Sequence, residues 1–380
     1  MSEGLDGVIV GDSTTSLVNG VEGKLIYSGY HIEDLAVNAL FEEVAFLLWN
    51  NRLPNQAELD ELVQHIANEA VLPEGVINLM KALPKDAHPM AVLRTAVSAL
   101  AHFDADSESN YITDKDKSVA HRLAIRLTGQ ITTATAAWER IRNGQEPLAP
   151  RADLNLSQNF VYMLTGTEPD ETASKAINVY LVLLAEHGMN ASTFTSRVVT
   201  GTIADMHSAI TAAIAALKGF AHGGANSEAM YQFLEIGEPD NVEHWFNSYI
   251  KTHEKRVMGI GHRIYKALDP RASILKEHAR ALSESSGNTK WFEIAERLEH
   301  AALADEYFIE RKLYPNVDYY SAIVLYTLNI PVDSFTPLFA MARIAGWTAH
   351  VIEQMGGRLI RPEVNYVGAM DLDWLPMDAR

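Results

Sequence analysis

Hydrophobic and polar positions alternate in the first thirty or so residues, whereas hydrophobic positions recur every three or four residues in the rest of the chain. The segments GVIV, TSLV and KLIYS alternate with a period of two and are separated by glycine-rich turns, a pattern typical of short strands. Asn19 and Gly20 form a hairpin signal between two of these segments. We therefore predict a small N-terminal β-hairpin or sheet followed by a mainly α-helical chain.

The helical pattern breaks at Pro, Gly and Asn/Asp clusters, which mark the expected helix ends. The predicted helices cover residues 32–36, 41–50, 56–68, 73–82, 89–103, 114–142, 157–164, 170–186, 227–236, 242–254, 271–283, 290–311, 319–328 and 335–355. The segments INVYLVLLA and MHSAITAAIAALKGF are hydrophobic around most of a helix, which predicts burial among other helices. The small residues of the second segment allow close helix approach and indicate a subunit interface.

The composition limits the classes of partner. The 380-residue chain is long enough for about two domains, and its 31 basic and 49 acidic side chains give a net charge of -18. This charge disfavours nucleic acids and anionic membranes as partners, so an anionic ligand has to be bound by local positive charge. The absence of cysteine excludes disulfides and thiolate chemistry. No secretory signal or membrane-spanning run is recognisable in the sequence, and we predict a soluble, cytoplasmic protein.

Common catalytic signatures are absent from the sequence, including the phosphate-binding loop, H-E-x-x-H and G-x-S-x-G. Three histidines stand instead in breaks between predicted helices: His187 in AEHGMNAST, His222 in FAHGGANSEAM and His262 in GIGHRIYKALDPRA. A histidine without a catalytic role is the commoner finding. Gly223 and Gly224, however, precede a helix, whose N-terminal N–H groups favour developing negative charge and a neutral imidazole.

One carboxylate and three arginines complete the candidate chemistry. Asp318 in KLYPNVDYYS starts a predicted helix, where it or Asn316 can equally be an N-cap. Arg343 lies between hydrophobic residues and should face an anion, whereas a surface salt bridge is an adequate explanation for Arg271 and Arg361. Such a set suits proton transfers on a substrate with several carboxylates, with a neutral imidazole stabilising the charge of the carbanion.

These pieces, in this order, resemble the citrate synthase family over nearly the whole chain. GYHIEDLAVNALFEEVAFLLWNNRLP, HPMAVLRTAVSAL and FTPLFAMARIAGWTAHVIEQ are similar to its compact bacterial members. The resemblance implies a two-domain helical fold, with a large domain of residues 1–223 plus 327–380 and a small, CoA-binding domain of residues 224–326. It also implies a homodimer whose domains close over the substrates, oxaloacetate first.

The implied reaction is a Claisen-type condensation of acetyl-CoA with oxaloacetate, followed by hydrolysis of citryl-CoA to citrate and CoA, without metal or cofactor. By resemblance, Asp318 is the base, His222 stabilises the enol or enolate, and His262 is the acid at the ketone. The oxaloacetate-binding positions are His187, Arg271, Arg343 and, from the neighbouring subunit, Arg361. The CoA-binding positions are Val257, Met258, Gly259, Ile260, Gly261, Lys266 and Lys312.

The sequence departs from common members of the family at Phe220, where they have Pro, and at Ser227, where they have Glu. We expect these changes to alter the shape of a helix start more than the chemistry. A 2-methylcitrate synthase that uses propionyl-CoA stays open, because one methylene gives only about 1–3 kcal/mol of discrimination. A non-catalytic helical scaffold and a histidine-rich metal-binding protein are further alternatives, although the 14 histidines lack the spacing of a helical metal site.

Overall fold

The structure, a computed structural model, describes residues 3–5, 7–108, 117–252 and 254–380. Its one small sheet consists of β1 (Ser16–Asn19), β2 (Lys24–Tyr27) and β3 (Tyr30–His31), which pair antiparallel in this order. The predicted hairpin is confirmed, but its loop has four residues because Asn19 pairs with Lys24 and its side-chain oxygen accepts hydrogen bonds from the N–H groups of Val21 and Glu22. The GVIV segment, expected as a strand, forms none.

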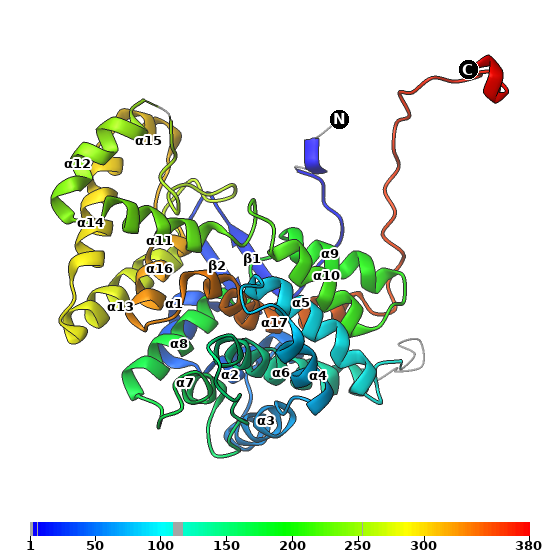
Figure 1. The fold of residues 1–380 in the computed structure, drawn as a ribbon, viewed down its shortest axis with the longest axis horizontal. Helices are drawn as coiled ribbons and strands as arrows, with labels where there is room; N and C mark the ends of the chain where they lie inside the picture. The colour runs from blue at the N-terminus through cyan, green and yellow to red at the C-terminus, as the bar shows by residue number, and fades with distance from the viewer. Residues whose placement is uncertain (1–2, 6, 109–116, 253) are drawn as a thin grey trace.

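The rest of the described chain is mainly helical, which confirms the predicted fold class (Figure 1). The α-helices are α1 (Ile32–Asn38), α2 (Phe41–Asn50), α3 (Gln56–Glu69), α4 (Glu74–Ala82), α5 (Pro89–Leu100), α6 (Ser118–Arg142), α7 (Leu156–Thr165), α8 (Glu171–Leu184), α9 (Ala191–Gly201), α10 (Met206–Leu217), α11 (Ala225–Ile236), α12 (Val242–Trp245), α13 (Pro270–Ser286), α14 (Lys290–Leu303), α15 (Glu306–Arg311), α16 (Val317–Thr327) and α17 (Phe335–Gln354).

Two helix predictions need correction, one helix has no counterpart in the prediction, and one prediction falls partly outside the described residues. The predicted helix at 290–311 is two helices, because the chain turns after α14 and the side chain of Asp305 caps α15. The predicted helix at 242–254 is α-helical only to Trp245 and continues as a π-helical turn, Phe246–Ile250. Helix α9 was not predicted at all. Residues 114–116 of the helix predicted at 114–142 lie outside the described residues, and α6 begins at Ser118.

Helix α17 forms the centre of the molecule (Figure 1). Most of its side chains are buried, and it packs against α2, α5, α6, α8, α9 and α10. Burial of hydrophobic side chains all around one helix requires neighbours on every side, as its sequence indicates. Helices α11 to α16 gather on one side of this core, where α13 and α16 pack together (Figure 1).

The C-terminal segment after α17 runs away from the helical body (Figure 1). Its residues are exposed from position 361 onward, and Val364 is 91% exposed. The exposed large hydrophobic side chains of this segment are Leu359, Val364, Tyr366, Val367, Met370, Leu372, Trp374, Leu375 and Met377. Hydrophobic surface of this extent is typical of a segment that packs against another chain.

Across the described residues, none of the helices is both long enough and hydrophobic enough to span a lipid bilayer.

Candidate functional site

His187 lies in the tight turn that connects α8 with α9. The Oη of Tyr265 is 3.2 Å from its Nε2, and its ring meets that of His262 edge-on with 5.4 Å between the centroids. Burial, followed by the nearby charges of Arg271 and Arg343, lowers the pKa of His187 well below its usual value. His187 is therefore a neutral imidazole close to two positively charged guanidinium groups.

His222 lies in the loop between α10 and α11, where the backbone N–H of Ser192 donates a hydrogen bond of 3.3 Å to its Nε2. The Ser192 hydroxyl is 2.8 Å from the same nitrogen. Because Nε2 accepts from the backbone, the ring proton lies on Nδ1, which is free to donate to a ligand. Burial and then the charge of Arg343 lower the pKa of His222 to about 4, which keeps the ring neutral near pH 7.

His262 is held in the opposite tautomer. Its Nδ1 accepts hydrogen bonds from the backbone N–H groups of Ile264 and Tyr265, at 3.1 and 3.2 Å. The ring proton therefore lies on Nε2. Burial and then the charge of Arg271 lower the pKa of His262 to about 4. His222 and His262 thus each present one hydrogen-bond donor, which is Nδ1–H on His222 and Nε2–H on His262.

The glycine loop before His262 is hydrogen-bonded to the segment that carries Asp318. Gly261 N–H donates to Tyr314 O at 2.8 Å, and Asn316 donates from its backbone to Gly259 O and from its side chain to Gly261 O. Gly259 has a φ of +78°, and a Cβ there would lie 2.8 Å from the Cα of Tyr319. Only glycine permits this approach. The loop and the start of α16 consequently form one connected unit.

Asp318 is part-buried in the first turn of α16, while Asn316 is the N-cap and accepts a hydrogen bond from the Asp318 N–H. The Asp318 carboxylate is thus not used as a cap, and among the described residues no group hydrogen-bonds to it. Burial raises its pKa to about 6 even though Arg271 and Arg343 lower it. A carboxylate with a raised pKa and unused oxygens is suited to accept a proton near neutral pH.

Arg271 is buried, so the surface salt bridge considered for it is wrong. Its Nε and Nη2 donate to the two carboxylate oxygens of Asp269 at 2.9 and 2.7 Å. Asp269 is also the N-cap of α13 and accepts from the Arg271 backbone N–H. The fork of hydrogen bonds fixes the guanidinium at the start of α13.

Arg343 is buried in the middle of α17, as its hydrophobic sequence neighbours indicated. Its Nε donates to Leu184 O at 2.6 Å. In the part of the chain that the structure describes, no protein group accepts a hydrogen bond from its two terminal nitrogens. Burial lowers the pKa of this guanidinium, but an arginine stays charged. Because an uncompensated buried charge is costly, these nitrogens fit a bound anion.

Each of the three histidines and Asp318 lies close enough to Arg271, to Arg343 or to both for the charge to shift its pKa. The charge of Arg343 acts on His187, His222 and Asp318, and that of Arg271 acts on His187, His262 and Asp318. The structure thus brings together six of the predicted residues: His187, His222, His262, Arg271, Asp318 and Arg343. Val257, Met258, Gly259, Ile260 and Gly261 border this group through the glycine loop.

Three predicted residues lie outside this group. Lys266 and Lys312 are exposed, and Lys312 is the left-handed C-cap of α15. Arg361 is exposed in the segment that leaves the helical body (Figure 1). The two departures from common family members are also placed. Phe220 is exposed, and the Ser227 hydroxyl donates to Val332 O.

Sequence reasoning missed Ser192, Asp269 and Tyr265, which contact the predicted residues. Ser192 stands two positions after Asn190, the N-cap of α9, whose side chain is the signal that a helix begins there. Within the described residues no group of three histidine or acidic side chains is arranged to hold a metal ion.

Comparison with known proteins identifies relatives of the whole chain. The family profile described as "Citrate synthase, C-terminal domain" matches residues 4–363. "Citrate synthase 2" of Bacillus subtilis is 44% identical over 381 residues, covering 100% of this chain and 99% of the relative. "Citrate/2-methylcitrate synthase" of the same organism is 39% identical over 369 residues, covering 97% and 96%.

A solved structure of similar fold is the ternary complex of carboxymethyl coenzyme A and oxaloacetate with citrate synthase from Thermoplasma acidophilum. It superposes with a TM-score of 0.93 at 35% sequence identity, and the match covers 100% of this chain and 99% of that one.

Proposed function

Because the chain belongs to the citrate synthase family, we propose that it condenses acetyl-CoA with oxaloacetate through Asp318, His222 and His262. The chain is thus an acyltransferase whose transferred acyl group becomes part of an alkyl chain. The observation that carries the residue assignment is the meeting of one carboxylate of raised pKa with two neutral imidazoles of opposite tautomer.

In the first step, the Asp318 carboxylate takes a proton from the methyl group of acetyl-CoA. The electron pair left on carbon moves toward the thioester oxygen, where the Nδ1–H of His222 donates a hydrogen bond. A neutral donor is well suited, because its hydrogen bond strengthens as the oxygen becomes negative. The backbone N–H of Ser192 fixes this tautomer throughout.

In the second step, the enol carbon attacks the ketone carbon of oxaloacetate and forms the new C–C bond. The ketone oxygen takes the proton from Nε2 of His262, whose Nδ1 is held by two backbone N–H groups. The product of this step is citryl-CoA. Water then cleaves its thioester to citrate and CoA.

For oxaloacetate, the free terminal nitrogens of Arg343 would bind one carboxylate. Arg271 would contribute its remaining donor capacity while Asp269 holds its orientation. His187 lies against His262 and would contact the same substrate. For CoA, residues 257–261 would pass along the nucleotide, and the exposed Lys266 and Lys312 would face its phosphates.

The assembly and location are part of the same proposal. Arg361 would reach the oxaloacetate of a second subunit in a homodimer, which the exposed hydrophobic side chains of the C-terminal segment support. We expect the enzyme to need no resident metal or cofactor, and a cytoplasmic location agrees with the lack of cysteine.

Release of free CoA thiol tests the function directly. We expect release from acetyl-CoA only when oxaloacetate is present, and the Asp153→Asn variant, whose exposed side chain pairs with Arg151 at the surface, should behave as the wild type. Faster release with propionyl-CoA would assign the 2-methylcitrate activity instead. Absence of release with either thioester from folded protein would leave the non-catalytic scaffold.

We propose that residues 224–326 form the small domain and that residues 1–223 and 327–380 form the large one. His262, Arg271 and Asp318 belong to the first, and His187 and Arg343 to the second, so a substrate bound by both arginines would draw the domains together. Small-angle X-ray scattering is expected to give a smaller radius of gyration with oxaloacetate than without it. An unchanged profile at saturating oxaloacetate would contradict closure.

A further inference from the structure

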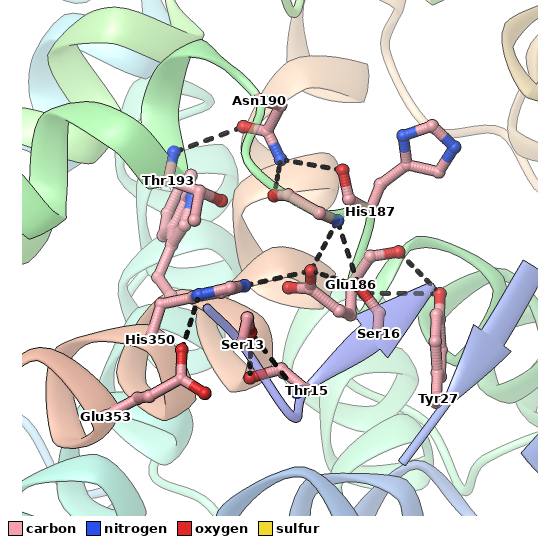
Figure 2. Close-up of polar contacts among 12 residues, drawn as sticks. Ser13, Thr15, Ser16, Tyr27, Glu186, His187, Asn190, Thr193, His350 and Glu353 are labelled. Atoms are coloured by element: carbon pink, nitrogen blue, oxygen red, sulfur yellow. Dashed lines mark hydrogen bonds and ion pairs between the residues drawn. The ribbon is translucent and has the colours of Figure 1, made fainter. Parts of the chain in front are cut away.

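A completely buried carboxylate lies one residue before His187. Glu186 is 0% exposed, and its Oε1 accepts hydrogen bonds from Ser16 Oγ, from the Gly188 N–H and from Nε2 of His350 (Figure 2). The other oxygen, Oε2, lies where a side chain on residue 346 would stand, since a Cβ on Gly346 would be 2.3 Å away. Glycine at position 346 of α17 therefore leaves room for the carboxylate of Glu186, although burying a charged group is energetically unfavourable.

His350 of α17 is the ion-pair partner of Glu186. Its ring is 1% exposed, with Nε2 3.0 Å from Glu186 and Nδ1 3.6 Å from Glu353. Arg197 from α9 lies against both His350 and Glu353. These three groups, Glu186, Glu353 and Arg197, are the charged side chains that face His350 among the described residues.

The turn that Glu186 holds carries His187 and leads to Ser192, which contacts His222. Gly188, at a φ of +61°, lies in the left-handed region, and its N–H is bound by the Glu186 carboxylate. Figure 2 shows the ring of His187 pointing away from this carboxylate. At the end of the turn, the Ser192 hydroxyl lies 2.8 Å from Asn190 Oδ1 and 2.8 Å from Nε2 of His222, and its one proton serves one of these two acceptors at a time.

The surrounding contacts leave the turn little other freedom. Tyr27 Oη donates to Glu186 O at 2.7 Å, and the Gly346 N–H lies 3.0 Å from Ala185 O. These bonds fix the backbone before the turn. The carboxylate of Glu186 fixes the turn itself, because its bond to the Gly188 N–H closes the loop in which His187 stands.

We propose that the Glu186–His350 ion pair is a positioning device that sets the places of His187 and His222 together and leaves Arg343 free to bind the substrate. The inference rests on the proposed function, since it assigns a role within that site. Neither residue contacts the reacting atoms, so both are positioning residues.

The role toward Arg343 follows from charge. Glu186 acts electrostatically on Arg343, so a carboxylate without its own counter-ion would compete with oxaloacetate for that guanidinium. His350 removes the competition as long as it is protonated. Burial opposes the charged ring, yet Glu186 raises the pKa of His350 to about 9. Burial likewise opposes the charge of Glu186, but His350 lowers the pKa of this carboxylate below its usual value.

The sign of the pH dependence is determined by these shifts. The folded-state pKa of His350 is raised, so the ion pair is intact at neutral pH and is lost as the pH rises through about 9. We expect the KM for oxaloacetate to increase and kcat to decrease above that pH, because His187 and His222 would both lose their positions. Direct calorimetric binding of oxaloacetate at several pH values measures the same effect without turnover.

Two amide variants and their combination test the pair. His350→Gln and Glu186→Gln keep the size of each side chain but remove one charge. Each is expected to raise the KM for oxaloacetate and lower kcat, with kcat/KM reduced about 10- to 100-fold, since small displacements of catalytic groups have effects of this size. The double variant should lose no more than the worse single variant, because both changes break one interaction. His350→Gln should also lose the rise in KM above pH 9.

His207→Gln is the matched control. His207 is equally buried and lies near two carboxylates, Asp104 and Asp205, but at the first turn of α10, whereas His222 follows the last turn. The control should lower the melting temperature without changing the KM for oxaloacetate. Strictly multiplicative losses in the double variant, or an unchanged alkaline rise in His350→Gln, would overturn the proposal.

Failure of this inference is distinguishable from failure of the proposed function. Wild-type protein that releases no CoA thiol with oxaloacetate would contradict the function. Active wild type whose two single variants keep their KM for oxaloacetate within about twofold, with intact circular dichroism, would contradict only the positioning role. If a variant does not fold, the pH dependence of oxaloacetate binding to the wild type still decides: constant affinity between pH 7 and pH 10 would overturn the role of His350.

Discussion

Replacing Asp318 by asparagine is expected to lower kcat about 10²- to 10⁴-fold, the usual contribution of a general base. The amide has the shape of the carboxylate but cannot accept the proton from the acetyl methyl group. The fold should persist, because the helix is capped by Asn316 and not by Asp318. Thiol release with acetyl-CoA and oxaloacetate measures the loss, and oxaloacetate binding should stay within about twofold of the wild type.

The pH profile provides the control for this assignment. Burial raises the pKa of Asp318 to about 6, and the base acts only when ionised, so kcat/KM is expected to fall about tenfold per pH unit below that value. His222 and His262, with pKa values lowered to about 4, add no acid limb above pH 5. Asp318→Asn should remove the limb. A variant that keeps more than a tenth of the wild-type kcat would exclude Asp318 as the base.

The second large effect is expected for His222→Ala, with kcat reduced about 10²- to 10³-fold, as for other single donors to a developing oxyanion. The alanine removes the only Nδ1–H donor that the tautomer argument assigns to the thioester oxygen. Oxaloacetate affinity should change little, because His222 serves the acyl donor. Steady-state kinetics and calorimetry with oxaloacetate separate the two quantities.

Ser192→Ala is the matched comparison for His222. It removes the hydroxyl 2.8 Å from Nε2 but keeps the backbone N–H that fixes the tautomer. We expect a loss of about tenfold or less, consistent with one hydrogen bond of about 1 kcal/mol. If Ser192→Ala were as inactive as His222→Ala, the hydroxyl rather than the backbone would determine the ring proton.

The helical fold could be predicted from the sequence wherever hydrophobic positions follow the helical period, as they do in α2 and α17. Helix α9 could not, because ASTFTSRVVTG is rich in hydroxyl and β-branched residues, and the face that it buries has no large hydrophobic side chain: Ser192, Thr193, Ser196, Arg197, Thr200 and Gly201. Its helical state depends on the Asn190 cap and on packing against α10 and α17. The hydrophobic period alone does not show the break between α14 and α15, which depends on the side-chain cap of Asp305.

The candidate site could be predicted as a set of residues but not as an arrangement. His187, His222, His262 and Asp318 stand at helix breaks, where local sequence is informative. Some of their partners are distant in sequence, and others are common residue types that give no sequence signal of their own. That Ser192 contacts His222 across 30 positions follows only from how the helices pack, whereas the hold of Asp269 on Arg271 is local and depends on the cap of α13. The tautomers of the two rings depend on those same contacts.

The hydrogen bonds between the glycine loop and Asn316 would connect the binding of CoA with the rate of proton transfer. If the loop binds the nucleotide end of CoA, part of that binding energy is used to hold the carboxylate of Asp318, two residues beyond Asn316, in place. An acyl donor that lacks the nucleotide would then react slowly even when saturating, because its binding would contribute no energy to keeping the loop and the base at their working positions. The nucleotide end of CoA, which does not react, would in this way determine the rate of the reaction.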